Sequence, residues 1–476
     1  MEEEISPVIG SSSCSDNNSN DNDSIKDDID IDDQDQQLET IDRHKDKHFY
    51  SRTSRSIKLP DQLHKLMKER IPPENSAQTE LKQGVEVLTQ QLWSRKVPVE
   101  KGQLQAKAKQ LQKEQFGEYL ESLSKNDFQE VMPKIKEIIV NKLRTTTYHW
   151  QPMQYDAFGA SCYLFGRMAM DYAIMRNVFQ EMRILDPSFR PRSCFDYGSG
   201  VGSVWWALKE EFPSSFNEYF SVELSMHMRD IARQLAQGGP SGKDLPTHEY
   251  AQRAQLPLRS KLTYDLSVSA FSLSELPTRR ERIDVIENLW SKTVRHLIIV
   301  ENGTHCGFEL VKEAREHILT LREKRHDNDK KDIWRNAYVL GPCTHNLPCQ
   351  RLAVESRKYP CSFPVRYRDL LTDADEKSLS SLYSYVILSK VQPKVQVSRQ
   401  PSARLIEEVL CRGKHVICRM CTSKGEIKET VFTKRKHDRT TYSAARKAHW
   451  GDLFPFEDAE SARRPAGVKK ETEEQT

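Results

Sequence analysis

The stretch Cys194-Phe-Asp-Tyr-Gly-Ser-Gly-Val-Gly202 decides the fold of this chain. Its first residues predict a short buried strand, and the pattern of residues 204–211 predicts that a helix follows the last glycine. Glycines between a strand and a helix let the backbone approach a ligand closely, and the helix presents its N-terminus to that ligand. The stretch therefore predicts a nucleotide-binding loop.

The spacing of the glycines and two acidic residues indicate which ligand the loop holds. A dinucleotide-binding loop reads Gly-x-Gly-x-x-Gly, whereas here the third glycine comes one residue earlier and an aspartate precedes the first. This version is typical of methyltransferases, in which the loop cradles the amino-acid end of S-adenosylmethionine. A second acid ends the next predicted strand, where a carboxylate can accept both ribose hydroxyls. A tight structural turn is the alternative for the loop alone. The candidate cofactor-binding residues are Asp196, Gly198, Gly200, Gly202 and Glu223.

Strands alternate with helices on the C-terminal side of this loop. This alternation predicts a parallel, doubly wound α/β sheet of the Rossmann-like, class I S-adenosylmethionine-dependent methyltransferase type. The expected strands are 194–197, 219–223, 265–269 and 296–301, and the expected helices are 204–211, 226–235, 279–290 and 307–324. A further strand is expected at 383–388.

The rest of the chain divides around this sheet. Apolar residues at helical spacing before residue 190, including a long helix candidate at 163–184, predict a helical N-terminal extension. The Tyr and Met residues of that long helix are expected to pack in the core. The predicted segments are a disordered acidic tail (1–56), a helical N-terminal region (57–190), the methyltransferase domain (191–325), a Cys-rich C-terminal lobe (326–457) and a disordered tail (458–476).

Charge is distributed unevenly along the 476 residues. Residues 1–42 contain 14 Asp and Glu and one Lys, a composition that cannot bury a core and predicts disorder. Residues 43–476 contain 71 Lys and Arg against 55 Asp and Glu, a net charge of +16. This balance favours a polyanionic partner such as RNA, with a lysine-rich solvated surface as the alternative. No apolar stretch reaches the ~18–20 residues that a membrane-spanning helix needs.

Six of the ten cysteines lie between positions 343 and 421. Structural zinc sites usually use paired Cys-x-x-Cys motifs, and only Cys418-Arg-Met-Cys421 has that form here. Wide, irregular spacing better suits an iron–sulfur cluster, in which each iron takes a thiolate. A zinc-bound binding module is the alternative. His345 is expected to be a hydrogen-bonding neighbour of the site rather than a ligand.

The expected catalytic signature of nucleic-acid methyltransferases is missing. Amino-group methyltransferases usually place an Asn/Asp/Ser-Pro-Pro-aromatic tetrapeptide after the fourth strand, whereas this chain has Ser269-Ala-Phe-Ser-Leu-Ser-Glu275. That stretch also lacks the cysteine nucleophile needed for carbon-5 methylation of pyrimidines. No catalytic residue is predicted, which favours a pseudo-enzyme. Because transfer from a sulfonium needs mainly in-line positioning, an active rRNA methyltransferase is the alternative.

Several motifs resemble a known family when they are taken in order. They are Arg190-Pro-Arg-Ser-Cys-Phe-Asp-Tyr-Gly-Ser-Gly, Val300-Glu-Asn-Gly-Thr-His-Cys-Gly-Phe308, Gly341-Pro-Cys-Thr-His-Asn-Leu-Pro-Cys349, Tyr359-Pro-Cys-Ser-Phe363, Tyr385-Val-Ile-Leu388, Tyr442-Ser-Ala-Ala-Arg-Lys and Trp450-Gly-Asp-Leu453. From about residue 60 to 457 the chain resembles the mitochondrial small-ribosomal-subunit methyltransferase-like proteins, called methyltransferase-like 17 proteins in animals.

The resemblance implies a role in assembling the mitochondrial small ribosomal subunit through its rRNA and ribosomal proteins, with no DNA partner. It also implies bound S-adenosylmethionine and a 4Fe-4S cluster, with little or no methylating activity. The implied cluster ligands are Cys343, Cys349, Cys361 and Cys421, with Cys418 as an alternative to the fourth.

A location in the mitochondrial matrix follows from the resemblance alone. Presequences are rich in Arg and poor in acids, and residues 1–42 are the opposite, although Tyr50-Ser-Arg-Thr-Ser-Arg-Ser-Ile-Lys58 has the expected basic, Ser-rich character. Near the other end, Lys434-Arg-Lys-His-Asp-Arg439 suits phosphate contacts to rRNA as well as an exposed turn.

Overall fold

The computed structural model describes residues 56–72, 76–256, 262–324, 336–351, 359–370, 378–392 and 402–455. The acidic segment 1–55, which includes most of the basic stretch 50–58, lies outside the described residues, as does the tail 458–476. The predictions of disorder for these two segments therefore stay predictions.

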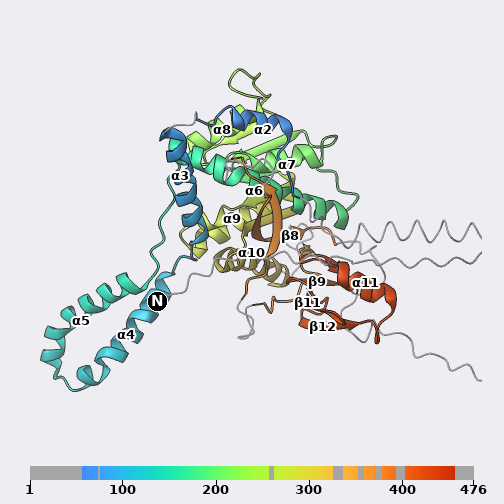
Figure 1. Cartoon of the computed structure of the whole chain (residues 1–476). Helices are drawn as coiled ribbons and strands as arrows, with labels where there is room; N and C mark the ends of the chain where they lie inside the picture. The colour runs from blue at the N-terminus through green and yellow to red at the C-terminus, as the bar shows by residue number, and fades with distance from the viewer. Residues whose placement is uncertain are drawn as a thin grey trace, which may run out of the picture.

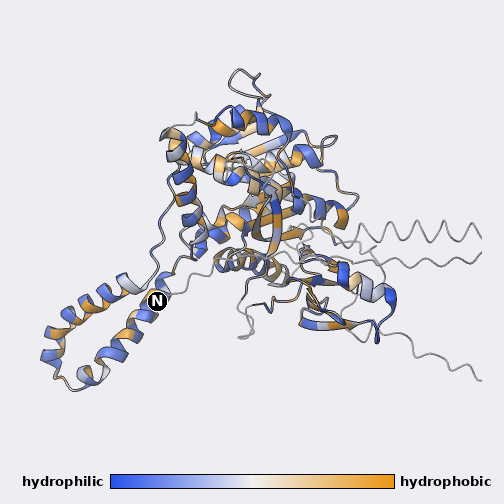
Figure 2. Ribbon diagram, in the orientation of Figure 1, coloured by the Kyte–Doolittle hydropathy of each residue, from blue (hydrophilic) through white to orange (hydrophobic). Residues whose placement is uncertain are grey.

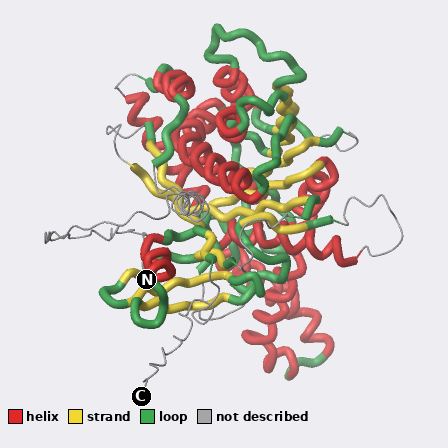
Figure 3. Tube along the Cα trace, turned by 90° about the vertical axis from the view of Figure 1, so that its right-hand side faces the viewer, coloured by secondary structure: helices red, strands yellow, loops and turns green. Residues whose placement is uncertain are grey.

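One large sheet forms the centre of the molecule (Figures 1 and 3). Its strands lie in the order β3-β2-β1-β4-β5-β8-β6, and β7 also pairs with β8. Strands β1 to β5 pair in parallel with one another, as predicted. The strands are β1 (Ser193–Tyr197), β2 (Glu218–Val222), β3 (Tyr250–Arg253), β4 (Tyr264–Ala270), β5 (Thr293–Asn302), β6 (Tyr338–Gly341), β7 (Phe363–Arg368) and β8 (Ser378–Ser389).

Two features of this sheet differ from the prediction. Strand β8 is antiparallel to β5, and both β6 and β7 are antiparallel to β8, so the sheet is mixed. These three strands also come after residue 325, where the methyltransferase domain was expected to end. An antiparallel strand between the fifth and sixth strands is the arrangement of class I methyltransferases. The sheet therefore has that fold, and it continues into the segment expected to be a separate lobe.

Helices cover both faces of the sheet because its buried strands are apolar on both sides. Along β5, Ile298 and Val300 belong to one core, and Leu297 and Ile299 to the other. Helices α6 (Ala157–Leu185), α7 (Ser203–Glu211) and α8 (Met226–Ala236) cover the first face, and α9 (Arg279–Lys292) and α10 (His305–Lys324) the second.

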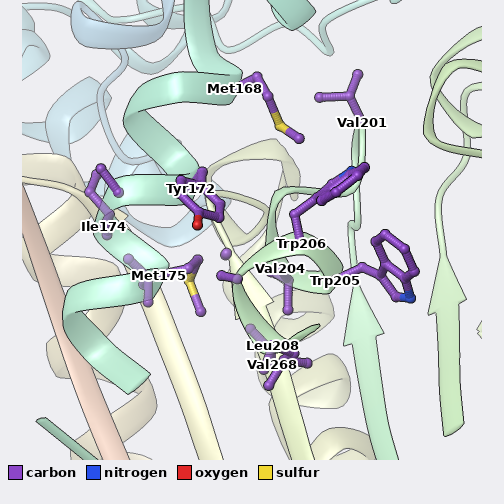
Figure 4. Packing of buried hydrophobic residues seen from close by; sticks show 14 of the residues in the cluster. Met168, Tyr172, Ile174, Met175, Val201, Val204, Trp205, Trp206, Leu208 and Val268 are labelled. Carbon is purple, nitrogen blue, oxygen red and sulfur yellow. The ribbon is translucent and has the colours of Figure 1, made fainter. Parts of the chain in front are cut away.

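Helix α6 is the main packing element of the first face. Its 29 residues begin after Asp156, whose side chain accepts a hydrogen bond from the Gly159 N–H at 2.7 Å. The start therefore lies six residues before the predicted one. Its buried Met168, Tyr172 and Met175 lie against α7 beside Trp206 and Val204 (Figure 4). The predicted core role of its Met residues agrees with this packing.

The N-terminal extension is helical, as predicted. Helix α2 (Asp61–Lys68) lies on the body, and α3 (Ser76–Trp93) packs against α6, where Gly84 and Gly166 allow close approach. Helices α4 (Lys101–Glu121) and α5 (Lys125–Thr146) form a hairpin that projects from the body (Figure 1). Polar and apolar residues are interspersed along this hairpin (Figure 2), and α4 has no buried residue.

A second, five-stranded sheet forms the C-terminal lobe (Figure 3). It has its own core around Met420, Phe432 and Phe454. Its elements are β9 (Ala403–Leu405), β10 (Leu410–Cys411), β11 (His415–Cys421), β12 (Ile427–Thr433), α11 (Arg439–Lys447) and β13 (Leu453–Phe454). Strand β11 lies between β9 and β12, which makes it the centre of this lobe.

Candidate functional site

The glycine loop lies between β1 and α7, as predicted. Gly198, Gly200 and Gly202 all have positive φ, at 71°, 52° and 92°, a conformation that residues with a side chain rarely adopt. A Cβ on Gly198 would lie 2.4 Å from the Cβ of Ser272, in the loop after β4. Gly198 and Gly200 line a pocket of about 520 Å³, whereas Gly202 lies behind it as the N-cap of α7.

Glu223, directly after β2, lines the same pocket and holds the loop in place. Its Oε2 accepts a hydrogen bond from the Gly200 N–H at 3.0 Å, and its Oε1 accepts one from the Ser225 N–H at 2.8 Å. Each carboxylate oxygen has a second lone pair, so both can still accept a ribose hydroxyl. Burial raises the pKa of Glu223, and the backbone N–H donors oppose that rise.

Asp196, the other predicted acid, is fully buried beneath the loop and does not line the pocket. Its Oδ2 accepts a hydrogen bond from the Tyr219 hydroxyl, and its Oδ1 has no partner among the described residues. Burial raises the pKa of Asp196 to about 7. This geometry assigns Asp196 to the support of the loop rather than to direct contact with a ligand.

The residues that form the opposite wall of the pocket were not predicted as site residues from the sequence. Tyr163 packs against the core, as expected, and it also lines the cavity near Gly200 and donates a hydrogen bond to Asp171 at 3.0 Å. Tyr155, just before α6, lines it as well. The remaining lining residues are Pro152, Met153, Gln154, Tyr197, Val222, Leu224, Ser225, Met228, Ala254, Gln255, Leu256, Phe271, Ser272, Glu275 and Leu276.

The loop after β4, where a methyl acceptor is expected, is held by several contacts. Phe271 has a positive φ of 59°, which is rare for a bulky residue. The guanidinium of Arg167 lies 4.6 Å from its ring centroid. Farther along, Glu275 pairs with Arg95 at 3.0 Å and lies 3.5 Å from the Tyr155 hydroxyl. This side of the pocket is therefore occupied by side chains that bond to one another.

Glu301, at the end of β5, supports that loop from below. It is buried and accepts hydrogen bonds from the N–H groups of Leu273 and Ser274, at 2.8 and 3.4 Å. Burial, together with the nearby Glu275 carboxylate, raises the pKa of Glu301 to about 8. This role could not be predicted from the sequence, because it depends on a contact between β5 and the turn after β4, which are distant in the chain.

The four predicted cysteine ligands line one small cavity of about 20 Å³, between the large sheet and the C-terminal lobe. Burial raises the pKa of the Cys361 thiol, and the nearby thiols of Cys343, Cys349 and Cys421 raise it further. Cys418 does not reach this cavity. It is buried in the core of the C-terminal lobe, because residues 418 and 421 lie on opposite faces of β11.

Buried arginines fix the backbone that carries these cysteines. Arg404 donates to the Pro342 carbonyl oxygen at 2.7 Å, Arg351 to that of Tyr359 at 2.9 Å, and Arg315 to that of Leu347 at 2.8 Å. His345 Nε2 lies 3.3 Å from Cys421 Sγ, and burial lowers the pKa of His345 to about 4, so its ring is neutral. This contact agrees with its expected role as a neighbour.

The cysteine cavity does not have the geometry of a single-ion site. Within the described ranges, no group of three or more His, Cys, Asp or Glu side chains is arranged to hold a metal ion.

The strand order, the glycine loop and Glu223 define a protein of the class I methyltransferase fold, here with a second sheet and a cysteine cavity. The chain belongs to the family described as mitochondrial small ribosomal subunit Rsm22, whose sequence profile matches residues 157–455. In the part of the chain that the structure describes, no helix is long and apolar enough to span a membrane.

Relatives of known name include mitochondrial proteins. The human protein described as "Ribosome assembly protein METTL17, mitochondrial" is 36% identical over 380 residues, which cover 80% of this chain and 79% of the human protein. A fission yeast protein, Schizosaccharomyces pombe "Rsm22-cox11 tandem protein 2, mitochondrial", is 27% identical over 340 residues. That match covers 64% of this chain and 44% of the yeast protein.

Solved structures with some likeness include methyltransferases. A putative RNA methyltransferase from Pyrococcus horikoshii is 10% identical, with a TM-score of 0.27, over 47% of this chain and 84% of that protein. Magnesium protoporphyrin IX methyltransferase from Synechocystis, with bound S-adenosylhomocysteine, is 12% identical, with a TM-score of 0.28, over 53% and 93%.

Proposed function

We propose that this protein is an assembly factor of the mitochondrial small ribosomal subunit. In this proposal it acts in the mitochondrial matrix, binds rRNA, and holds S-adenosylmethionine and a 4Fe-4S cluster without transferring a methyl group. The observation that carries the proposal is the family match over residues 157–455, because that range includes the glycine loop, Glu223 and all four cysteines of the cavity. The human relative, 36% identical, is named as a ribosome assembly protein.

The pocket geometry supports S-adenosylmethionine as the cofactor. Gly198 and Gly200 present backbone without side chains to the cavity, and the N-terminus of α7 follows. Glu223 lies where the ribose of a nucleoside is expected and has lone pairs to accept its hydroxyls. When bound, the cofactor would supply a sulfonium methyl group.

The acceptor side supports a binding role rather than catalysis. Glu275 is engaged by Arg95, and the ring of Phe271 is covered by Arg167. A general base must lie within hydrogen-bond reach of the proton that it abstracts. Glu275 is already held in an ion pair with the buried Arg95, so its carboxylate is engaged within the protein.

The proposed iron–sulfur cluster is supported by four cysteines that line one cavity. Zinc is the alternative, and it would take its sulfur ligands about 2.3 Å from one ion. In a 4Fe-4S cluster each thiolate binds a different iron, so the sulfurs surround the group. Cys343, Cys349, Cys361 and Cys421 would hold it, and the adjacent Arg404 and Arg351 fix the backbone on either side of them.

Cells depleted of their own family member provide the test. Expression of this chain should restore mature mitochondrial small subunits on a sucrose gradient, while labelled S-adenosylmethionine transfers no tritium to small-subunit rRNA. Stoichiometric transfer of tritium to that rRNA by the purified protein would instead establish the alternative, an active rRNA methyltransferase. Correct import into mitochondria without any restoration of small subunits would refute the assembly role.

A further inference from the structure

A groove on the C-terminal lobe is lined by cationic side chains from two segments. The register of β11 and β12 pairs His415 with Thr433, which brings the turn before β11 alongside the turn after β12. Their residues line a groove of about 690 Å³, far from the cysteine end of β11. The lining residues are Gly413, Lys414, His415, Val431, Thr433, Lys434, Arg435 and Lys436.

The turn that carries three of these cations is held in one shape. The Lys436 N–H donates to Thr433 Oγ1 at 3.2 Å, and the Thr433 N–H donates to Nδ1 of the buried His437 at 3.0 Å. Lys434, Arg435 and Lys436 are exposed on this turn. The three cationic side chains therefore extend from a turn whose backbone conformation is held by hydrogen bonds.

The positive charge of the segment around the groove is not neutralised by the acidic residues of the same segment. Residues 411–447 contain eleven Lys and Arg against three Asp and Glu, a net charge of +8. All three acids have other partners: Glu426 pairs with Lys428, Glu429 with Arg419, and Asp438 caps α11 through Thr441. The four Lys and Arg side chains of the groove form no ion pair with another described residue.

We propose that this groove binds the phosphate backbone of RNA. The inference rests on the proposed function and adds the surface on which the rRNA would lie. Four closely spaced cations in a groove without a carboxylate match a run of phosphates, since each Lys or Arg can neutralise one. Exposed Val431 gives the groove an apolar floor against which sugars or bases can pack.

The test compares two variants of the full chain in filter binding to a transcript of mitochondrial small-subunit rRNA over a salt series. The groove variant carries Lys414→Gln, Lys434→Gln, Arg435→Gln and Lys436→Gln. The control variant loses the same charge from exposed positions on the body, through Lys65→Gln, Lys82→Gln, Lys243→Gln and Arg253→Gln. Circular dichroism confirms that both are folded.

The groove variant should bind the transcript at least about tenfold more weakly. The slope of log K against log salt should become less negative by about two to three, because each lost phosphate contact removes ~0.7 from its magnitude. The control should keep both values close to wild type. Equal binding by wild type and groove variant would overturn the groove while leaving rRNA binding intact. Failure of the wild type itself to bind would overturn the proposed rRNA binding as well. Equally strong competition by poly-glutamate would assign the groove to an acidic protein surface.

Discussion

Glu181 of α6 and Arg404 of β9 form a buried ion pair, with 2.6 Å between Oε1 and Nη2. The same carboxylate accepts a hydrogen bond from the Tyr385 hydroxyl of β8, and the same guanidinium holds the carbonyl oxygen of Pro342, beside Cys343. Helix α6 reaches the cofactor pocket through Tyr163. This one pair therefore joins the methyltransferase fold to the second sheet at the cysteine cavity.

Replacement of Glu181 by Ala should destabilise the protein strongly. Loss of one partner leaves the Arg404 charge buried and unpaired, which typically costs about 3–5 kcal/mol. The free energy of unfolding in urea measures this effect. Glu210→Ala, which removes a half-exposed partner of Arg176, is the matched control and should cost less than about 1 kcal/mol. Equal effects of the two changes would show that the interdomain pair is unimportant.

Gly198→Ala should destabilise the loop by about 2 kcal/mol or more. The new Cβ would meet the Cβ of Ser272 at 2.4 Å, and its φ of 71° is unfavourable for alanine. Gly102→Ala, where nothing lies within 4 Å in the first turn of α4, should be neutral or stabilising by up to about 1 kcal/mol. Thermal unfolding of both variants checks the contrast. A stable Gly198→Ala protein would contradict the described loop geometry.

Glu223→Gln should weaken binding of S-adenosylmethionine by about tenfold or more. Hydrogen bonds to a charged group contribute about 1.5–3 kcal/mol, and the carboxylate both orders Gly200 and is expected to meet the ribose. Isothermal titration calorimetry gives the Kd directly. Glu218→Gln, an exposed residue at the start of the same strand, serves as the control and should bind as wild type does. Unchanged affinity of Glu223→Gln would remove this residue from the cofactor site.

Stability should fall as pH rises from about 4.5 to about 8. The pKa of Glu301 is raised in the folded state to about 8, so the folded protein holds a proton that the unfolded chain has lost. The contribution of Glu301 to the free energy of unfolding is fully present below its ordinary pKa. This contribution is lost as the pH rises through the raised pKa, at up to about 1.4 kcal/mol per pH unit. Burial also raises the pKa of Asp196, to about 7, and of Asp171, to about 6, with the same sign.

Glu301→Gln should flatten this dependence, measured as the free energy of unfolding in urea at several pH values. Asp284→Asn, at an exposed position of α9, should leave the dependence unchanged. A Glu301→Gln protein that loses stability with pH as steeply as wild type would show that this carboxyl does not titrate in that range.

Local patterns predicted most strands of the large sheet, including the strand at 383–388 that lies in β8, but not how the strands pair at its far edge. Strands β1, β2, β4 and β5 were predictable because each is an apolar run next to a turn or a helix. Strand β3 is only four residues long and was missed. The positions of β6, β7 and β8 depend on pairing between segments distant in sequence, which periodicity does not reveal. For the same reason the predicted end of the methyltransferase domain, at residue 325, comes before these three strands of the sheet.

In the candidate site, too, the residues that belong to local motifs were predictable and those brought in by distant segments were not. The glycine loop and Glu223 are local to two adjacent strands, and both lie at one pocket. Tyr163 packs against the core, as predicted, but its second role as a pocket wall could not be predicted, because a helical pattern does not tell a core face from a pocket wall. The choice between Cys418 and Cys421 was open to sequence reasoning, since Val416, Cys418 and Met420 alternate as the buried face of β11. That alternation places Cys421 on the other face, with the cavity.

The central claim is that one cavity of four cysteines holds an iron–sulfur cluster beside a methyltransferase fold. Iron, sulfide and zinc content, with a visible absorption spectrum, test it on anaerobically purified wild type, Cys421→Ser and Cys418→Ser. We expect about four irons and four sulfides in wild type and Cys418→Ser, and their loss together in Cys421→Ser. Stoichiometric zinc without sulfide, or a cluster that depends on Cys418 instead of Cys421, would contradict the account.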